Sequence, residues 1–294
     1  MGAYHQMGYD SWNLVNEEAL NGYQGIVLSP VNDSPEAVSA KLKKLDKLRS
    51  SIEVILDPQL YEPSSNRGQL TNWDYFSNDV DTVDLNNDAW WDQRGKALLA
   101  EAIDIGADAI CSPAMLPRRA FSDDYYRWTV DCAKRLAPDA AEAKKDLLLT
   151  AIVRLPDLAV AGRAESIASI LTSTKISRVY LVISDDLAPR AQRVDAEALA
   201  GVMRLIKLLE AAESRVLVAF SGLDMLLWKA AGASSAATGK YFNLRRFVPG
   251  RWEDAQEGGR VISFWTDEQL ISWIREPDVR LLDRQELIDR ANNC

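Results

Sequence analysis

Short apolar runs recur along the chain, and each ends in a small or polar residue before a segment of helical period. The runs lie at residues 3–7, 25–29, 53–57, 109–112, 147–153, 179–184, 216–221 and 235–239. The helical segments between them include residues 34–49, 89–106, 123–137, 165–173 and 195–212. Strands that are apolar throughout and alternate with helices are typical of a parallel sheet covered by helices. The repeat therefore predicts an α/β protein with a (β/α)8 barrel of the TIM type.

Two of the runs are weak strand candidates. Residues 3–7 are short and polar for a core strand, and residues 235–239 are weak as a strand by themselves. Without these two runs the pattern would describe an open doubly wound sheet of about six strands. That open sheet is the alternative to the barrel.

Two segments interrupt the alternation. Residues 58–88 form a long connection without periodicity, and its aromatic residues favour a folded lid or binding loop over disorder. Residues 243–294 hold a candidate strand at 260–265, a helix from Asp267 and a final helix at 283–291. We expect a barrel over residues 1–242 and a C-terminal extension, residues 243–294, packed on it.

Composition narrows the class of protein. A chain of 294 residues with 47% hydrophobic and 26% charged residues has the balance of a folded protein. The net charge of -9 argues against a globally basic nucleic-acid surface and leaves only a local basic groove for such a partner. Three cysteines without a CxxC pair indicate a reducing compartment. The sequence shows neither a secretory signal nor a long apolar stretch, so we expect a soluble, cytoplasmic protein without a membrane partner.

In a TIM barrel the active site lies at the carboxyl ends of the strands. Asp57 is the first candidate for a catalytic residue, because a proline turns the chain into the aromatic loop directly after this strand-end carboxylate. Asp185 and Asp186 hold the equivalent place after the sixth run and would supply the second carboxylate of an acid–base pair. His5, the only histidine, ends the first run and is the fourth catalytic candidate. A turn cap at Asp57, solvated loop acids at 185–186 and a hydrogen-bonded histidine are the structural alternatives.

Other polar and basic residues occupy the same end of the predicted strands or their loops. The candidates for substrate binding are Gln6, Ser29, Tyr61, Trp73, Ser112, Arg118, Arg119, Arg154, Ser221, Gly222, Gly239 and Lys240. The recurrence of arginine in these loops, which also include Arg245, Arg246 and Arg251, indicates an anionic ligand, and pairing of these arginines with surface acids is the equal alternative. Tyr61 and Trp73 would stack on a sugar ring or nucleobase, or pack within their own loop.

Metal and cofactor chemistry is restricted by residue type. One histidine and scattered cysteines provide no zinc ligand set, so no metal site is assigned. A Mg²⁺ site formed by Asp57, Asp185 and water molecules is the alternative that residue type does not exclude. The chain has neither a GxGxxG fingerprint nor a GxSxG elbow, so we expect no organic cofactor and no serine nucleophile.

Two segments resemble the tRNA-guanine transglycosylase family. VILDPQLY, residues 54–61, resembles the place where that family keeps a carboxylate after a barrel strand, and GADAICSPAMLPRR, residues 106–119, is similar to a later strand with its arginine-containing loop. Ser112 or Pro113 stands where the family has its nucleophilic aspartate, and the family's glycine-rich loop and zinc cluster have no counterpart. The resemblance implies a nucleoside-like ligand bound without base exchange.

The leading hypothesis is an enzyme without organic cofactor that acts on a glycosidic or N-glycosidic bond of a sugar or nucleoside-like molecule through strand-end carboxylates. One alternative is a barrel that binds a phosphorylated small molecule through Arg154, Gly222, Gly239 and Lys240. The other is a non-catalytic barrel that serves as a binding or scaffold subunit of a protein complex.

Overall fold

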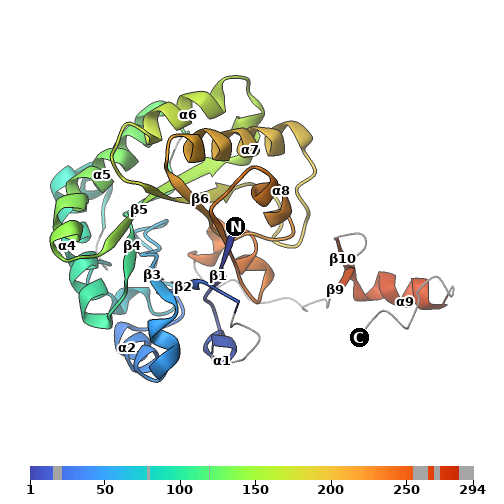
Figure 1. Cartoon of the computed structure of the whole chain (residues 1–294), viewed down its shortest axis with the longest axis horizontal. Coiled ribbons are helices and arrows are strands. Elements are labelled where there is room, and N and C mark those ends of the chain that lie inside the picture. Colours follow the sequence, from blue (N-terminus) through green and yellow to red (C-terminus); the bar gives the residue numbers. More distant parts are fainter. Residues whose placement is uncertain (16–21, 78–79, 119, 254–263, 268–271, 285–294) are drawn as a thin grey trace. The chain divides into compact units, whose positions relative to one another are not determined.

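A computed structural model describes residues 1–15, 22–77, 80–118, 120–253, 264–267 and 272–284 (Figure 1). Eight parallel strands close into a barrel in chain order, with β1 hydrogen-bonded to both β2 and β8. The strands are β1 (Gly2–Gln6), β2 (Gly25–Leu28), β3 (Glu53–Leu56), β4 (Ala109–Cys111), β5 (Asp146–Arg154), β6 (Arg178–Ser184), β7 (Arg215–Val218) and β8 (Ser235–Thr238). The predicted (β/α)8 barrel is confirmed, and the two weak runs are the strands that close it.

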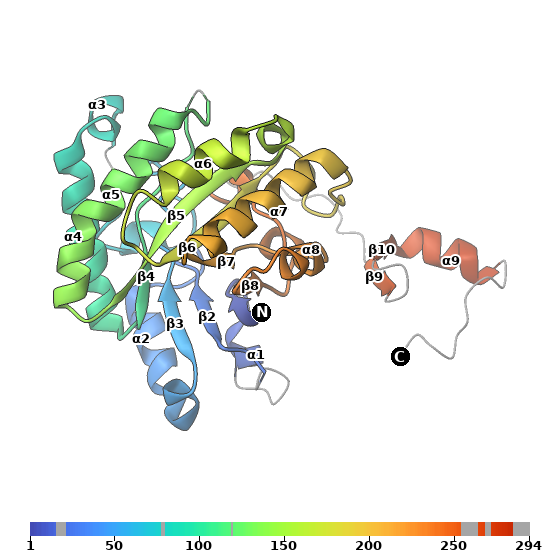
Figure 2. The ribbon, with the colours of Figure 1, turned by 45° about the horizontal axis from the view of Figure 1, so that its top comes forward.

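Helices surround the barrel and cover its strands (Figure 2). They are α1 (Trp12–Val15), α2 (Pro35–Lys43), α3 (Thr82–Leu85), α4 (Asp88–Ile105), α5 (Asp123–Glu142), α6 (Arg163–Leu171), α7 (Ala196–Ala211) and α8 (Met225–Ala230). Local signals fix their ends: the Ser34 hydroxyl caps α2 ahead of Pro35, and Gly106 ends α4 in the left-handed conformation at φ 77°. None of the helices in the described part of the chain combines the length and the apolar character that a membrane crossing requires.

Polar side chains at the start of β1, β3, β5 and β6 contact one another at the amino end of the barrel. Arg178, the first residue of β6, donates to Glu53 Oε2 at 2.9 Å and to Asp146 Oδ2 at 3.0 Å. Tyr4 of β1 donates its hydroxyl proton to the same Glu53 carboxylate. These contacts join four of the eight strands at this end, and the candidate residues lie at the opposite, carboxyl end.

The long connection after β3 is folded. Its aromatic residues Trp73, Tyr75 and Phe76 are buried and contact one another, with ring centroids 5.6 Å apart in both pairs. Trp73 Nε1 also donates to the carbonyl of Asp33 at 3.0 Å. The loop therefore packs largely on itself. This agrees with the alternative in which its aromatic residues pack within the loop rather than stack on a ligand.

The chain divides into two compact units, Met1–Asp254 and Ala255–Cys294. Residues 243–254, which the sequence pattern places in the extension, are part of the first unit. The packing of the remaining extension on the barrel stays a prediction.

In the second unit, β9 (Phe264–Asp267) and β10 (Ser272–Arg275) pair antiparallel and precede α9 (Glu276–Arg284). A strand at 272–275 stands where a helix from Asp267 was expected, because Trp273 and Ile274 favour the extended backbone. Most of the helix expected at 283–291 lies outside the described residues.

Candidate functional site

Asp57 follows β3 at the carboxyl end of the barrel and is 1% exposed. Its Oδ1 accepts a hydrogen bond from the backbone N–H of Gln59 at 3.0 Å, so the carboxylate does cap a turn. Its Oδ2 accepts from the hydroxyls of Tyr61 at 2.9 Å and Tyr180 at 3.1 Å. The turn-capping role and a place in a buried polar site are therefore both present in one side chain.

Tyr180 connects Asp57 to the first strand. Its hydroxyl lies 3.3 Å from Gln6 Oε1 as well as within reach of Asp57. A hydroxyl carries one proton, and a carboxylate is the stronger acceptor, so Tyr180 donates to Asp57. Gln6 Nε2 is buried without a partner among the described residues. When the amide is turned so that Nε2 faces Tyr180, Gln6 donates to the tyrosine oxygen and completes the series of hydrogen bonds from Gln6 to Asp57.

A second branch runs to β2 and to the segment after β8. The Gln59 side chain accepts from the backbone N–H of Val31 at 3.1 Å and donates to Ser29 Oγ at 3.4 Å. Arg251 Nη2 donates to Ser29 Oγ at 2.8 Å and to Asn32 Oδ1 at 2.7 Å. We call the connected residues the polar cluster: Gln6, Ser29, Asp57, Gln59, Tyr61, Tyr180 and Arg251.

Burial dominates the electrostatics of the polar cluster. It raises the pKa of Asp57 to about 6, against the opposite effects of the Gln59 N–H, the two tyrosine hydroxyls and the Arg251 charge. Burial likewise lowers the pKa of Arg251 to about 10, although the Asp57 carboxylate acts in the other direction. The site thus holds a carboxyl group that changes charge just below neutral pH beside a permanent cation.

Residues 245–252, the cap segment, cross the carboxyl end of the barrel. Phe247 forms an isolated parallel bridge with the last residue of β6, whereas Arg251 binds the loop after β2. Between these anchors the rings of Phe247 and Trp252 pack against Tyr61 at centroid distances of 4.9 and 4.8 Å. The cap segment therefore covers the polar cluster in this structure.

Asp185 belongs to a different network. Its side chain is 2% exposed, and its oxygens accept from Arg193 Nε at 2.6 Å and from Arg246 Nη1 at 3.1 and 3.2 Å. Arg193 also pairs with Asp224 at 2.5 Å. Among the described residues Asp57 and Asp185 have separate partners, so the two carboxylates belong to different networks, and their action as an acid–base pair stays a prediction.

Three further candidates form ion pairs near the surface. Asp186 is 83% exposed and pairs with Arg154 at 3.0 Å, and Arg154 also lies 3.6 Å from Asp157. Lys240 pairs with Asp10 at 3.3 Å. None of these contacts involves the polar cluster.

His5 is buried but lies on the other face of the sheet. Successive strand residues point to opposite faces, and Gln6 faces the barrel interior where it meets Tyr180, so His5 points toward the surrounding helices. Its ring meets Tyr23 edge-on at 6.0 Å, and its Nε2 has no partner among the described residues. Burial lowers the pKa of His5 to about 4, which keeps the imidazole neutral at pH 7.

The remaining strand-end candidates make structural contacts. Ser112 Oγ accepts from the N–H of Thr150 at 2.9 Å, and Ser221 Oγ donates to the carbonyl of Val218 at 3.0 Å. The N–H of Gly222 donates to Asp224 Oδ1 at 2.9 Å.

Gly239 has a steric role: a Cβ there would come within 2.6 Å of the Gln6 carbonyl oxygen and 2.4 Å of Leu244 Cβ. A glycine is needed for this close approach of two chain segments.

The side-chain hydrogen bond of Arg118, in the loop after β4, lies outside the polar cluster. Arg118 is exposed and donates to Thr82 Oγ1 at 2.9 Å, whereas Arg119 lies outside the described residues. Of the predicted residues, the structure thus unites Asp57, Gln6, Ser29 and Tyr61 in one cluster. Gln59, Tyr180 and Arg251 complete the cluster, and none of them was named as a site residue. Two signals in the sequence point to them: Gln59 shares the DPQLY turn with Tyr61, and Arg251 is one of the loop arginines.

No protein-family model matches the chain, and no curated protein matches it in sequence. Among solved structures, a GH18 chitinase from Pseudoalteromonas aurantia is similar at 9% identity with a TM-score of 0.52, over 83% of this chain and 95% of that one. The carboxyl transferase domain of Rhizobium etli pyruvate carboxylase is similar at 10% identity with a TM-score of 0.51, over 81% of this chain and 40% of that one. The likeness is one of fold. At such identities the barrel is shared by proteins of different chemistry, so function must be argued from the site.

Proposed function

We propose that the protein is a barrel enzyme that cleaves an N-glycosidic bond in a nucleoside-like substrate, with Asp57 as its reacting carboxylate. The observation that carries this proposal is a buried carboxyl group at the carboxyl end of the barrel, with a pKa raised to about 6 and two tyrosine hydroxyls on one oxygen. Perturbed carboxyl groups in such positions are typical of catalytic acids and bases.

Asp57 acts as the base. Three hydrogen bonds are donated to its oxygens, so the surroundings hold the ionised form in place above pH 6. A carboxylate of raised pKa is a stronger base than an ordinary one and removes a proton from an attacking water molecule. Its negative charge also stabilises the positive charge that develops on the sugar ring in the transition state.

The site favours an N-glycosidic over an O-glycosidic bond. Most enzymes that cleave O-glycosidic bonds use two carboxyl groups, one of which protonates the leaving oxygen. The side chains that hydrogen-bond to Asp57 in the described structure are Tyr61 and Tyr180, and Asp185 is neutralised by Arg193 and Arg246. A heteroaromatic base departs more readily, because its ring delocalises the electron pair of the broken carbon–nitrogen bond and a ring nitrogen takes up a proton from solvent.

Substrate entry requires the cap segment to move. The ring of Tyr61, whose hydroxyl donates to Asp57, packs 4.8 Å from the ring of Trp252, and Arg251, itself part of the cap segment, donates to Ser29. Opening the cap would expose these rings for stacking on a base and free the guanidinium for an anionic group of the substrate.

The test is turnover of a substrate panel by the wild-type protein and Asp57→Asn. We expect release of free base from at least one nucleoside or nucleoside monophosphate, with a rate at least about 100-fold lower in the variant. Folding of the variant is checked by its circular dichroism spectrum. Retained turnover in Asp57→Asn, or turnover of nitrophenyl glycosides alone, would contradict the proposal, and binding without turnover of any member would favour the non-catalytic barrel.

A further inference from the structure

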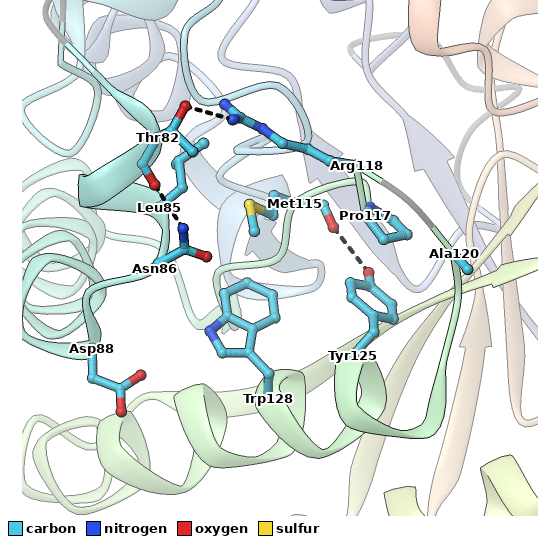
Figure 3. A pocket seen from close by; sticks show the side chains of 10 residues that line it. All are labelled: Thr82, Leu85, Asn86, Asp88, Met115, Pro117, Arg118, Ala120, Tyr125 and Trp128. Atoms are coloured by element: carbon cyan, nitrogen blue, oxygen red, sulfur yellow. Dashed lines mark hydrogen bonds between the residues drawn. The ribbon is translucent and has the colours of Figure 1, made fainter.

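A pocket of about 570 Å³ lies between α3, α5 and the loop after β4, apart from the polar cluster (Figure 3). It is lined by Thr82, Leu85, Asn86, Asp88, Met115, Pro117, Arg118, Ala120, Tyr125 and Trp128. Its volume is in the range of small-molecule sites, which are largely preformed and mostly apolar. None of its lining residues belongs to the polar cluster.

The wall of the pocket is aromatic and held in place. Tyr125 and Trp128 project from α5 with ring centroids 6.1 Å apart, and Trp128 packs edge-on against Trp91 at 5.0 Å. The Tyr125 hydroxyl donates to the carbonyl of Met115 at 3.0 Å and fixes the loop on the opposite side (Figure 3). A flat ring fits between such surfaces with little rearrangement.

The two ends of the pocket differ in charge. At one end Arg118 donates to Thr82 Oγ1 at 2.9 Å and has no ion-pair partner in the part of the chain that the structure describes. At the other end Asp88 pairs with Arg135 at 3.3 Å. Asn86 donates to the Thr82 carbonyl at 2.8 Å, and its Oδ1 is left as an acceptor toward the interior (Figure 3).

We propose that this pocket binds a small planar ring compound that carries one anionic group. The ring lies against Trp128 and Met115, and the anionic group pairs with Arg118. The opposite edge of the ring, which faces Asn86 and Asp88, is neutral or carries a hydrogen-bond donor. This binding goes beyond the reaction at Asp57 and does not depend on it.

Isothermal titration calorimetry tests the proposal with two probes of the same ring, 2-naphthoate and the neutral 2-naphthylmethanol. We expect 2-naphthoate to bind about tenfold more tightly than the alcohol, the effect of one charge-assisted contact. Arg118→Gln should remove this difference, and Ala120→Trp, which fills the pocket from its rim, should weaken both probes. Arg127→Gln is the matched control, because this exposed arginine of α5 pairs with Asp124 and does not line the pocket.

Asp57→Asn should bind both probes as the wild type does, so failure of the proposed reaction and failure of this site are distinguishable. The proposal is overturned when neither probe binds, when the two bind equally, or when Arg118→Gln leaves the preference for 2-naphthoate intact. Unchanged affinity in Ala120→Trp would place the bound probe elsewhere and also overturn it.

Discussion

Tyr180 of β6 donates a hydrogen bond to Asp57, at the end of β3, across the barrel interior at 3.1 Å. The two strands are not neighbours in the sheet, so the contact exists only because the barrel closes. It gives the Asp57 carboxylate a second hydroxyl donor beside Tyr61 and fixes its position at the carboxyl end of the barrel. The geometry of the proposed base is therefore a product of the whole fold.

Tyr180→Phe should raise the pKa of Asp57 further, because the hydroxyl stabilises the ionised carboxylate. The lost hydrogen bond should also reduce the free energy of unfolding by about 1 kcal/mol. Carbon-13 NMR of labelled aspartate and urea denaturation measure the two effects. Tyr75→Phe is the control, since the Tyr75 hydroxyl is buried without a partner among the described residues; an equal loss in both variants would disprove the role of the hydrogen bond.

Asp57→Asn should gain stability relative to the wild type as pH rises. The folded state holds the proton of Asp57 up to about pH 6, above the ordinary value of 3.8, so the stability associated with the neutral carboxyl group is lost between these values. The difference in unfolding free energy between variant and wild type should shift in favour of the variant by on the order of 2–3 kcal/mol from acid to neutral pH. Urea titrations across this range measure it. A difference that does not vary with pH would rule out the raised pKa.

His5→Gln should show the opposite pH dependence. Burial lowers the pKa of His5 from 6.5 to about 4, so the unfolded chain binds the proton more readily and wild-type stability rises with pH between these values. The variant lacks this gain, so its free energy of unfolding should decrease relative to that of the wild type toward neutral pH, by on the order of 3 kcal/mol. The same urea titrations apply, and a parallel pH dependence of the two proteins would show that His5 titrates normally.

Much of the fold follows from local pattern. Strands buried on both faces are apolar throughout, which is why runs such as 179–184 are visible in the sequence. Even the short β1 and β8 are predictable, because closure of the barrel requires partners for both edges. The strand at 272–275 was missed because its aromatic and β-branched residues are too few to outweigh a helical pattern.

The site is less predictable, because it depends on contacts between distant segments. Asp57 could be found at a strand end, but Arg251 reaches its neighbourhood only through the course of the cap segment. Asp185 stands at an equivalent strand end, yet Arg193 and Arg246 take up its charge. Strand-end position identifies polar residues near the site, and only the partners decide which carboxylate is available.

Asp185→Ala should destabilise the protein by about 3 kcal/mol, because it leaves the buried Arg246 without its carboxylate and Arg193 with Asp224 alone. Arg246 lies directly before Phe247 in the cap segment, so loss of its partner should also increase proteolysis within this segment. Asp186→Ala is the matched control: this neighbour is 83% exposed, and its loss should change stability by less than about 1 kcal/mol. Similar stability and proteolysis in the two variants would contradict the assigned network.

The role of Asp57 as a base is tested most directly by the pH dependence of kcat for base release from the best substrate of the panel, measured in wild type and Tyr180→Phe. The ionised carboxylate is the active form, so kcat should rise through about pH 6 and level off above it, and the inflection should move to higher pH in Tyr180→Phe. A kcat that falls as pH rises through this range would make Asp57 an acid. An inflection that does not move in Tyr180→Phe would assign the titration to another group.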